Sequence, residues 1–211
     1  MRAVVVLWLV PTLASAIVAA EPNDAKEKCT DELDARGIAW KKGSRPGIQD
    51  PVEITGTLGG TPLTSEVPLV IDCSLAISLD EAGKYMHDLG IEKAYFSNAY
   101  SRRNVRGTNH PSKHSFGLAI DIHTFTLPDL GTLRIDRDYE QGLGDDYDCV
   151  GSPMTRGGAV LKVLQCQLVR SGLFHLVLSP DYDDAHHDHF HLEALPWTAR
   201  TQLRASTQAI H

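Results

Sequence analysis

The segment SKHSFGLAIDIHTF, residues 112–125, holds the clearest alternation of apolar and polar side chains in the chain. Its apolar series consists of Leu118, Ile120 and Ile122. Asp121 and His123 belong to the intervening series, and successive side chains of a strand point to opposite faces. We therefore predict a half-buried strand over residues 117–125 with polar groups on its second face.

A second segment, VLSPDYDDAHHDHFHLE at residues 177–193, ends in a similar pattern. The polar face of a strand predicted over residues 189–195 carries His189, His191 and Glu193. Phe190 and Leu192 alternate with them on the apolar face. Further short strands are predicted at residues 52–55, 91–100, 132–135 and 174–178.

An amphipathic helix is indicated by apolar residues at three- and four-residue spacing between Leu75 and Leu89. Gly90 ends this helix. The first residue of the helix is predicted only to within one turn, because Ser78 and Glu81 have the spacing of a capping box and the apolar pattern begins at Leu75.

A second helix is marked by apolar residues within 160–168 and is closed by Gly172. A short helix is predicted within residues 24–38, and loops are predicted at 101–113 and 142–153. The expected class is α+β, with a small, mostly antiparallel sheet and two or three helices.

The first 20 residues are typical of a secretory signal peptide. Arg2 precedes an apolar run that contains Pro11, and small residues lead to Ala20, where we predict cleavage. The run is too irregular for a membrane span, which needs about 20 consecutive apolar residues. We expect a periplasmic or secreted protein with no integral membrane segment after cleavage.

The rest of the chain is long enough for one domain with its own core. Residues 21–70 are predicted to form an amino-terminal subdomain or extension, residues 71–200 the main domain, and residues 201–211 a polar tail. The sequence does not determine the oligomeric state, and we expect a monomer.

The formal net charge of −7 makes a nucleic-acid partner unexpected, because proteins that bind nucleic acid usually carry a basic face. The four cysteines include no CxxC pair, so a zinc knuckle is not indicated. In an exported protein an even number of cysteines predicts disulfides. Three pairings are possible, and we prefer Cys29 with Cys73 and Cys149 with Cys166, since each pair lies in one contiguous region.

Histidine is concentrated in one part of the chain: eight of the ten histidines fall within residues 110–191. Zinc binds imidazole nitrogen and carboxylate oxygen, and a catalytic zinc site combines three protein ligands with a water. His114 and Asp121 are seven residues apart, and on a regular strand this odd spacing would place their side chains on opposite faces. A turn at residues 115–117, where Gly117 allows unusual dihedrals, can bring His114 over Asp121.

Each motif has an ordinary alternative explanation. A His-x-His pair on a strand is more often a surface pair than a ligand pair, and a run of histidines can be a solvated loop that binds metals only adventitiously. Here two strands, each apolar on one face, both present histidine or aspartate on the other. This combination favours a site for one Zn²⁺ ion.

From about Cys29 to Trp197, the sequence resembles the bacterial extensin-like C-terminal domain family on the two segments quoted above. That family is similar to the zinc metallopeptidases of the D-Ala-D-Ala carboxypeptidase, lysostaphin and hedgehog group, which share an SxHxxGxAxD motif and a later HxH. The motif is complete here in Ser112, His114, Gly117, Ala119 and Asp121. The resemblance implies a hedgehog/D-Ala-D-Ala peptidase-like zinc domain.

The metal ligands implied by the resemblance are His114, Asp121 and His191. His189 would lie beside the metal-bound water as base or transition-state stabiliser, and His186 matches a further histidine of some murein endopeptidases. An arginine of the preceding loop would face the oxyanion, and Arg102 is preferred over Arg103, although both are equally well explained as surface charges.

The resemblance implies an exported zinc metallopeptidase that hydrolyses amide bonds of peptidoglycan peptides, as a carboxypeptidase or endopeptidase. Zinc would lower the pKa of its bound water from about 15.7 to near 7 and polarise the carbonyl. The alternative is a non-catalytic, zinc-containing cell-wall-binding module in which Glu193 or His123 fills the fourth metal position. The sequence favours an enzyme but identifies neither the bond that is cut nor whether one is cut.

Overall fold

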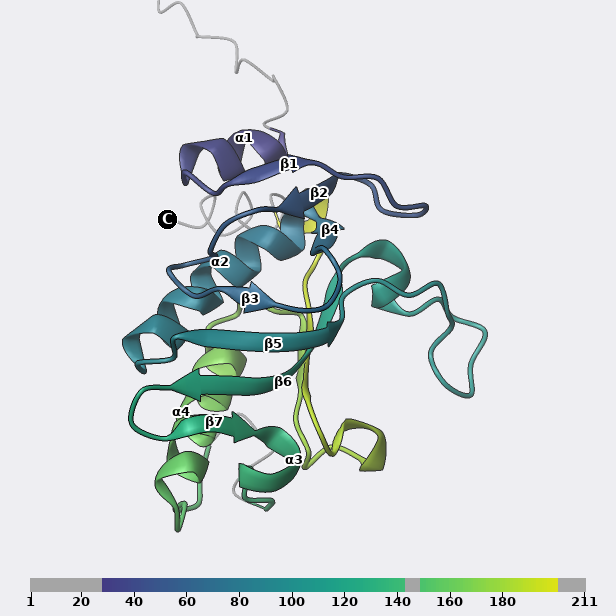
Figure 1. Cartoon of the computed structure of the whole chain (residues 1–211). Coiled ribbons are helices and arrows are strands. Elements are labelled where there is room, and N and C mark those ends of the chain that lie inside the picture. The colour runs from purple at the N-terminus through teal and green to yellow at the C-terminus, as the bar shows by residue number, and fades with distance from the viewer. Residues whose placement is uncertain (1–27, 143–148, 201–211) are drawn as a thin grey trace, which may run out of the picture.

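The computed structural model describes residues 28–142 and 149–200. These residues form an α+β fold with a three-stranded sheet, a larger six-stranded sheet, and helices packed against them (Figure 1). The predicted signal peptide at residues 1–20 and polar tail at 201–211 lie outside the described residues. Within the described part of the chain, no helix is both long and apolar enough to cross a membrane.

The smaller sheet is antiparallel and follows the order β1-β2-β4. Its strands are β1 (Trp40–Lys42), β2 (Pro51–Ile54) and β4 (Val70–Asp72). Only β2 corresponds to a predicted strand, at residues 52–55. The other two are three residues long, and a strand that short has no alternation from which to predict it.

The larger sheet is mostly antiparallel, as predicted, and its main path runs β3-β5-β6-β9-β8, with β7 pairing with one part of β6. Only β3 and β5 pair in parallel. The strands are β3 (Leu63–Thr64), β5 (Lys93–Asn98), β6 (Ala119–Leu127), β7 (Gly131–Arg134), β8 (Leu176–Leu178) and β9 (Phe190–Glu193). β3 is missed by the sequence analysis, whereas the strand predicted at 132–135 is found as β7 and pairs with β6.

β6 is more buried than a half-buried strand. Ile120 and Ile122 belong to the hydrophobic core, as the alternation predicts, but Ala119 and Asp121 on the other face are buried as well. The prediction of a solvated second face is therefore wrong at the start of β6. The strand is central in the sheet there, and β5 and β9 flank it.

Two long helices, α2 (Cys73–Asp88) and α4 (Arg156–Arg170), lie behind the larger sheet in the view of Figure 1. α2 begins earlier than a capping box at Ser78 would require. Its cap is Asp72, whose carboxylate accepts a hydrogen bond from the Ser74 amide. Ser78 is instead fully buried inside the helix and donates to the Leu173 carbonyl.

The remaining helices of the described residues are short. α1 (Cys29–Ala35) falls within the helix predicted at 24–38, although residues 24–27 are outside the described part. α3 (Ile135–Asp138) follows β7, and two 3-10 helices, η1 (Lys113–Phe116) and η2 (Asp184–His186), precede β6 and β9.

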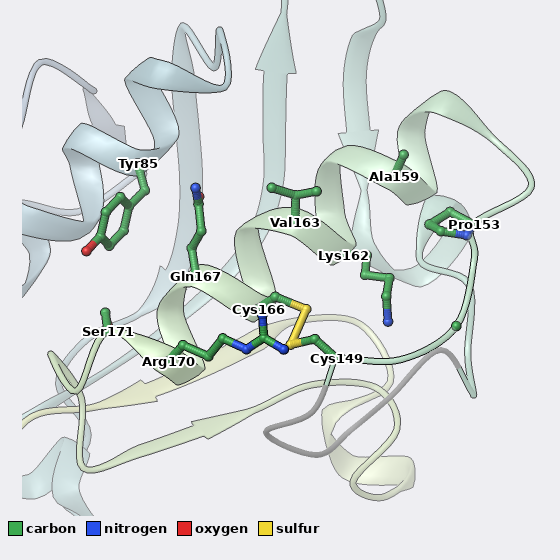
Figure 2. Close-up of a pocket in the computed structure, with 11 residues that line it drawn as sticks. Tyr85, Cys149, Pro153, Ala159, Lys162, Val163, Cys166, Gln167, Arg170 and Ser171 are labelled. Carbon is green, nitrogen blue, oxygen red and sulfur yellow. A yellow bond between two sulfur atoms is a disulfide. The ribbon is translucent and has the colours of Figure 1, made fainter.

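Both predicted disulfides are present, Cys29–Cys73 and Cys149–Cys166. The first joins α1 to the start of α2. The second ties α4 to the end of the predicted 142–153 loop, of which residues 143–148 lie outside the described part. Beside it is a mainly apolar hollow of about 640 Å³, which shares no residue with the histidine cluster (Figure 2).

Candidate metal centre

Asp121 and His191 face each other across neighbouring strands. β6 and β9 are antiparallel, and their register pairs Asp121 with His191. Asp121 Oδ1 lies 2.7 Å from His191 Nδ1, and both residues are buried. Strand pairing alone therefore joins the two sequence segments that were singled out for their polar faces.

His114 is directed toward the same point by η1. Ser112 caps the amino end of η1, and Gly117 closes its carboxyl end with a left-handed φ of 63°. A Cβ atom at Gly117 would lie 2.6 Å from Ile48 Cδ1 and 2.8 Å from the Asp72 amide nitrogen. Glycine is therefore required there by backbone conformation and by space, and the predicted turn at 115–117 corresponds to the end of η1 and its cap.

The three predicted ligands converge. His114 Nε2 lies 3.3 Å from Asp121 Oδ1 and 3.3 Å from His191 Nδ1, and His114 is fully buried. A tetrahedral zinc with bonds of about 2.0–2.1 Å separates its donor atoms by about 3.3 Å. Two of the three separations match this value, while the third is the 2.7 Å hydrogen bond between Asp121 and His191. The donor set therefore has the chemistry that zinc requires and, in two of its three separations, the spacing.

Two of these side chains are held by further contacts, Asp121 from the neighbouring strand β5 and His191 from within β9. Asn98, at the end of β5, lies with its Nδ2 3.3 Å from Asp121 Oδ2 and leaves Oδ1 directed at the histidines. Glu193 Oε1 lies 3.0 Å from His191 Nε2, so the carboxylate holds one ring nitrogen while the other faces Asp121. The Nδ1 atom of His114 is buried without a hydrogen-bond partner among the described residues, so the polar contacts of this ring are those of Nε2 with Asp121 and His191.

The cluster is strongly polarised. Burial opposes ionisation of Asp121, but hydrogen bonds with His114 and His191 outweigh burial and hold the Asp121 pKa far below its usual range. Burial also disfavours the charged form of His191, but its hydrogen bonds with Asp121 and Glu193 raise its pKa to about 9. In the metal-free protein the charge of protonated His191 thus offsets part of the negative charge of Asp121 and Glu193.

The chain matches a known protein family over most of its length. The sequence model of a family described as "Extensin-like protein C-terminus" matches residues 27–203. The chain belongs to this extensin-like family. No curated protein and no solved structure matches the chain.

In this extensin-like protein His189 lies beside the three donors, directly before β9. Its Nε2 is 3.5 Å from Asp121 Oδ1, and its Nδ1 is 2.7 Å from Asp188 Oδ1. Burial lowers the His189 pKa more than the hydrogen bond to Asp188 raises it. The imidazole is therefore neutral at pH 7, and a proton on Nδ1 directed at Asp188 leaves Nε2 as a proton acceptor facing the cluster.

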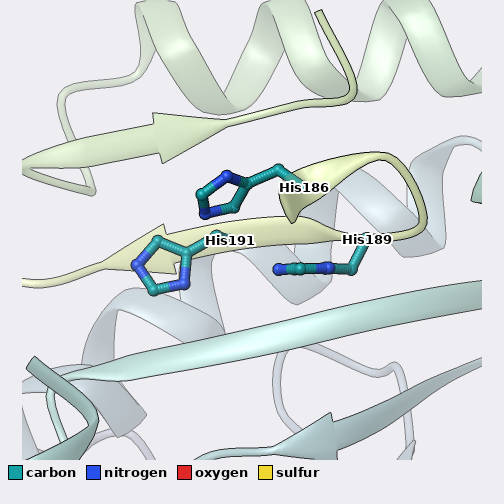
Figure 3. Close-up of side chains that lie close together, drawn as sticks. All are labelled: His186, His189 and His191. Carbon is teal, nitrogen blue, oxygen red and sulfur yellow. The ribbon is translucent and has the colours of Figure 1, made fainter. Parts of the chain in front are cut away.

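His186 extends the cluster from η2 (Figure 3). Its Nδ1 lies 2.5 Å from Asp183 Oδ1, and its ring centroid is 5.2 Å from that of His189 and 5.6 Å from that of His191. One ligand atom from each of these three histidines lies within 4.8 Å of the others. His187, which has no predicted role, is exposed.

Both side chains considered as fillers of a fourth metal position have other contacts. Glu193 contacts His191 at the ring nitrogen that does not face Asp121. His123 Nε2 lies 2.7 Å from Ser97 Oγ, and its Nδ1 lies 3.7 Å from Asp188 Oδ2. Neither contact is directed at the point where the three predicted ligands meet.

The predicted arginines lie on the loop that leads into η1. Arg102 and Arg103 are both exposed, and the contacts of Arg103 with Ser115 involve its backbone. Within residues 28–142 and 149–200, neither guanidinium forms an ion pair. The structure thus brings this loop to η1 but does not bring either guanidinium together with the histidines.

The sequence analysis missed the residues that orient the others, namely Asn98, Asp183 and Asp188. Asn98 depends on the register of β5 against β6, which contains irregularities that alternation cannot reveal. Asp183 and Asp188 are easier to predict from the sequence, because each lies within three residues of the histidine that it contacts. An acidic residue one or three positions before a candidate histidine is a local signal that would have found both.

Proposed function

We propose that this extensin-like protein is an exported zinc-dependent peptidase that hydrolyses amide bonds of peptidoglycan peptides. The observation that carries the proposal is the convergence of His114, Asp121 and His191, with His189 beside them and directed at Asp121. Three protein donors leave one position of a tetrahedral ion for water, as catalytic sites require. Two disulfides support export to an oxidising compartment.

Each residue has a part that its contacts support. His114, Asp121 and His191 would hold the zinc, which when bound acts as a Lewis acid on a carbonyl and lowers the pKa of water. His189 Nε2 would accept a proton during attack and return it to the leaving amine. Asp188 would keep the His189 proton on Nδ1, so that Nε2 stays available.

Two further assignments rest on the resemblance. Arg102 would move toward the developing oxyanion when substrate binds, with Arg103 as the alternative. His186 would contact the substrate beside His189, where its ring already packs. Asp183 would orient His186 as Asp188 orients His189.

The test is to incubate the purified zinc-loaded protein with cross-linked and uncross-linked muropeptides and to identify the products by mass spectrometry. We expect cleavage by the wild type, and a loss of at least about a hundredfold in His189→Ala with its zinc retained, because general-base catalysis contributes roughly that much. His187→Ala is the matched control, since it removes an exposed histidine two positions away. A wild type that binds zinc and cleaves none of these substrates would favour the non-catalytic wall-binding module.

A further inference from the structure

The segment of residues 101–113, a loop that ends at the first residue of η1, is basic in an otherwise acidic protein, and we call it the basic arm. Residues 93–120 contain no aspartate or glutamate, whereas the whole chain has a formal net charge of −7. The cations of the arm are Arg102, Arg103, Arg106 and Lys113. In the described residues none of them forms an ion pair, whereas Arg36, Arg134 and Arg137 each contact carboxylates.

The arm is an ordered hairpin rather than a loose connection. Asn104 and Pro111 form an isolated β-bridge, and the Val105 amide donates to the His110 carbonyl at 2.8 Å. The tip is a turn closed by a hydrogen bond from the Thr108 amide to the Val105 carbonyl, with Gly107 at a φ of 76°. Arg106 therefore has a fixed place at the corner of this turn, where it is exposed.

The base of the arm is attached to the candidate metal centre. The Ser101 amide donates to the His114 carbonyl at 3.2 Å, and the Arg103 amide donates to Ser115 Oγ at 3.0 Å. The Ser112 amide donates back to the Arg103 carbonyl. In Figure 1 the arm stands out from the body of the molecule on the side where the chain enters β6. A chain of substrate that extends from the metal centre on that side would pass along it.

We infer that the basic arm binds carboxylates of the peptide on which the protein acts. The inference rests on the proposed function and names the recognised chemistry, an acidic peptide. Guanidinium groups bind carboxylates through paired, charge-assisted hydrogen bonds, and unpaired cations would offset the repulsion between an acidic protein and an acidic substrate. Nucleic acid is not favoured, because its binders have a basic pI, whereas this chain has a pI of about 5.8.

The experiment measures binding of the purified protein to insoluble peptidoglycan sacculi, either native or with their carboxylates converted to amides. All variants carry Asp121→Ala as well, so that neither bound zinc nor turnover contributes to the measured binding. The same measurement is repeated on the protein without Asp121→Ala in the presence of a chelator, which controls for an effect of that substitution on folding. We expect Arg103→Gln/Arg106→Gln to weaken binding to native sacculi by about tenfold, as for the loss of two exposed ion pairs. Conversion of the sacculus carboxylates to amides should weaken binding of the protein with an unsubstituted arm by a similar factor.

The matched control is Arg134→Gln/Arg137→Gln, which removes two exposed arginines away from the arm and changes the net charge equally. Equal binding by the arm variant and this control would overturn the inference, as would undiminished binding to amidated sacculi. Vesicles of anionic phosphatidylglycerol are a further probe. Binding to them that depends on the arm would mean that the arm recognises phosphate groups and not peptide carboxylates. Arm-dependent binding without any muropeptide cleavage would refute the peptidase but leave the carboxylate surface standing.

Discussion

At the scale of single residues, the candidate centre depends on groups that orient the predicted ligands. Glu193 contacts His191 Nε2, and Asn98 contacts Asp121 Oδ2, so each contact leaves the other donor atom directed inward. Such outer contacts fix the tautomer of a ligating histidine and raise its basicity. The contact with Glu193 favours the tautomer in which Nε2 carries the proton and Nδ1 is free for a metal.

We predict that Glu193→Ala weakens zinc binding by about ten- to a hundredfold, because the His191 ring loses its acceptor. Competition with a chromophoric chelator measures the dissociation constant. Glu193→Gln is the matched variant, since it removes the same charge but keeps an oxygen acceptor, and it should lose less affinity. Equal losses in the two variants would mean that charge, rather than orientation, is what Glu193 supplies.

Single residues could be predicted where they belong to a repeating pattern. Asp121 and His191 stand on predicted strands, and the turn predicted at residues 115–117 could bring His114 over Asp121 in spite of their odd spacing. Asn98 could not be predicted, because its place opposite Asp121 depends on an irregular strand register. The positions of the Arg102 and Arg103 side chains could not be predicted either, since no sequence pattern fixes the direction of a loop residue.

At the scale of elements, α1 is held on α2 by a disulfide and by an ion-pair group around Arg36. Arg36 Nε lies 2.6 Å from Glu32 Oε1, and its Nη1 contacts both Asp80 and Glu81 of α2. Burial opposes ionisation of Glu81, but hydrogen bonds from Lys84 and Arg36 outweigh burial and lower its pKa below the usual 4.5. The ionised form of Glu81 is therefore favoured in the folded protein.

We predict that the stability difference between wild type and Arg36→Gln is largest at neutral pH and shrinks as the pH falls below about 4.5. A carboxyl group whose pKa is lowered by folding stabilises the fold above its unfolded pKa, and this contribution is lost on acidification through the folded pKa. Urea unfolding at pH 7 and pH 3 measures the difference. Lys41→Gln, which breaks the exposed pair with Glu53, should change little at either pH, and a constant Arg36→Gln difference would refute the assignment.

Long elements could be predicted, and short ones could not. α2, α4 and β6 each contain several repeats of their pattern, whereas β1, β3 and β4 have two or three residues and are recognised only by their partners. The start of α2 could be predicted only to within one turn, because Ser78 and Glu81 have the spacing of a capping box, while the true cap, Asp72, ends a strand that could not be predicted.

At the scale of the whole molecule, the smaller sheet supports the candidate centre. The Asp72 amide at the end of β4 donates to the Gly117 carbonyl at 2.9 Å, and Ile48 packs where a side chain at residue 117 would lie. The turn that directs His114 inward is therefore built against the amino-terminal part of the chain. The alternation within residues 117–125 could not show this support, because it comes from residues about 45 to 70 positions earlier.

The central claim is that His114, Asp121 and His191 bind one zinc ion, and the zinc content of the purified protein tests it most directly. Elemental analysis after dialysis should find about one zinc per chain in the wild type and none in Asp121→Ala, because removal of the carboxylate leaves only two of the three donors. Asp184→Ala, an exposed aspartate of η2, is the matched control and should keep its zinc. Stoichiometric zinc in Asp121→Ala, or none in the wild type, would contradict the account.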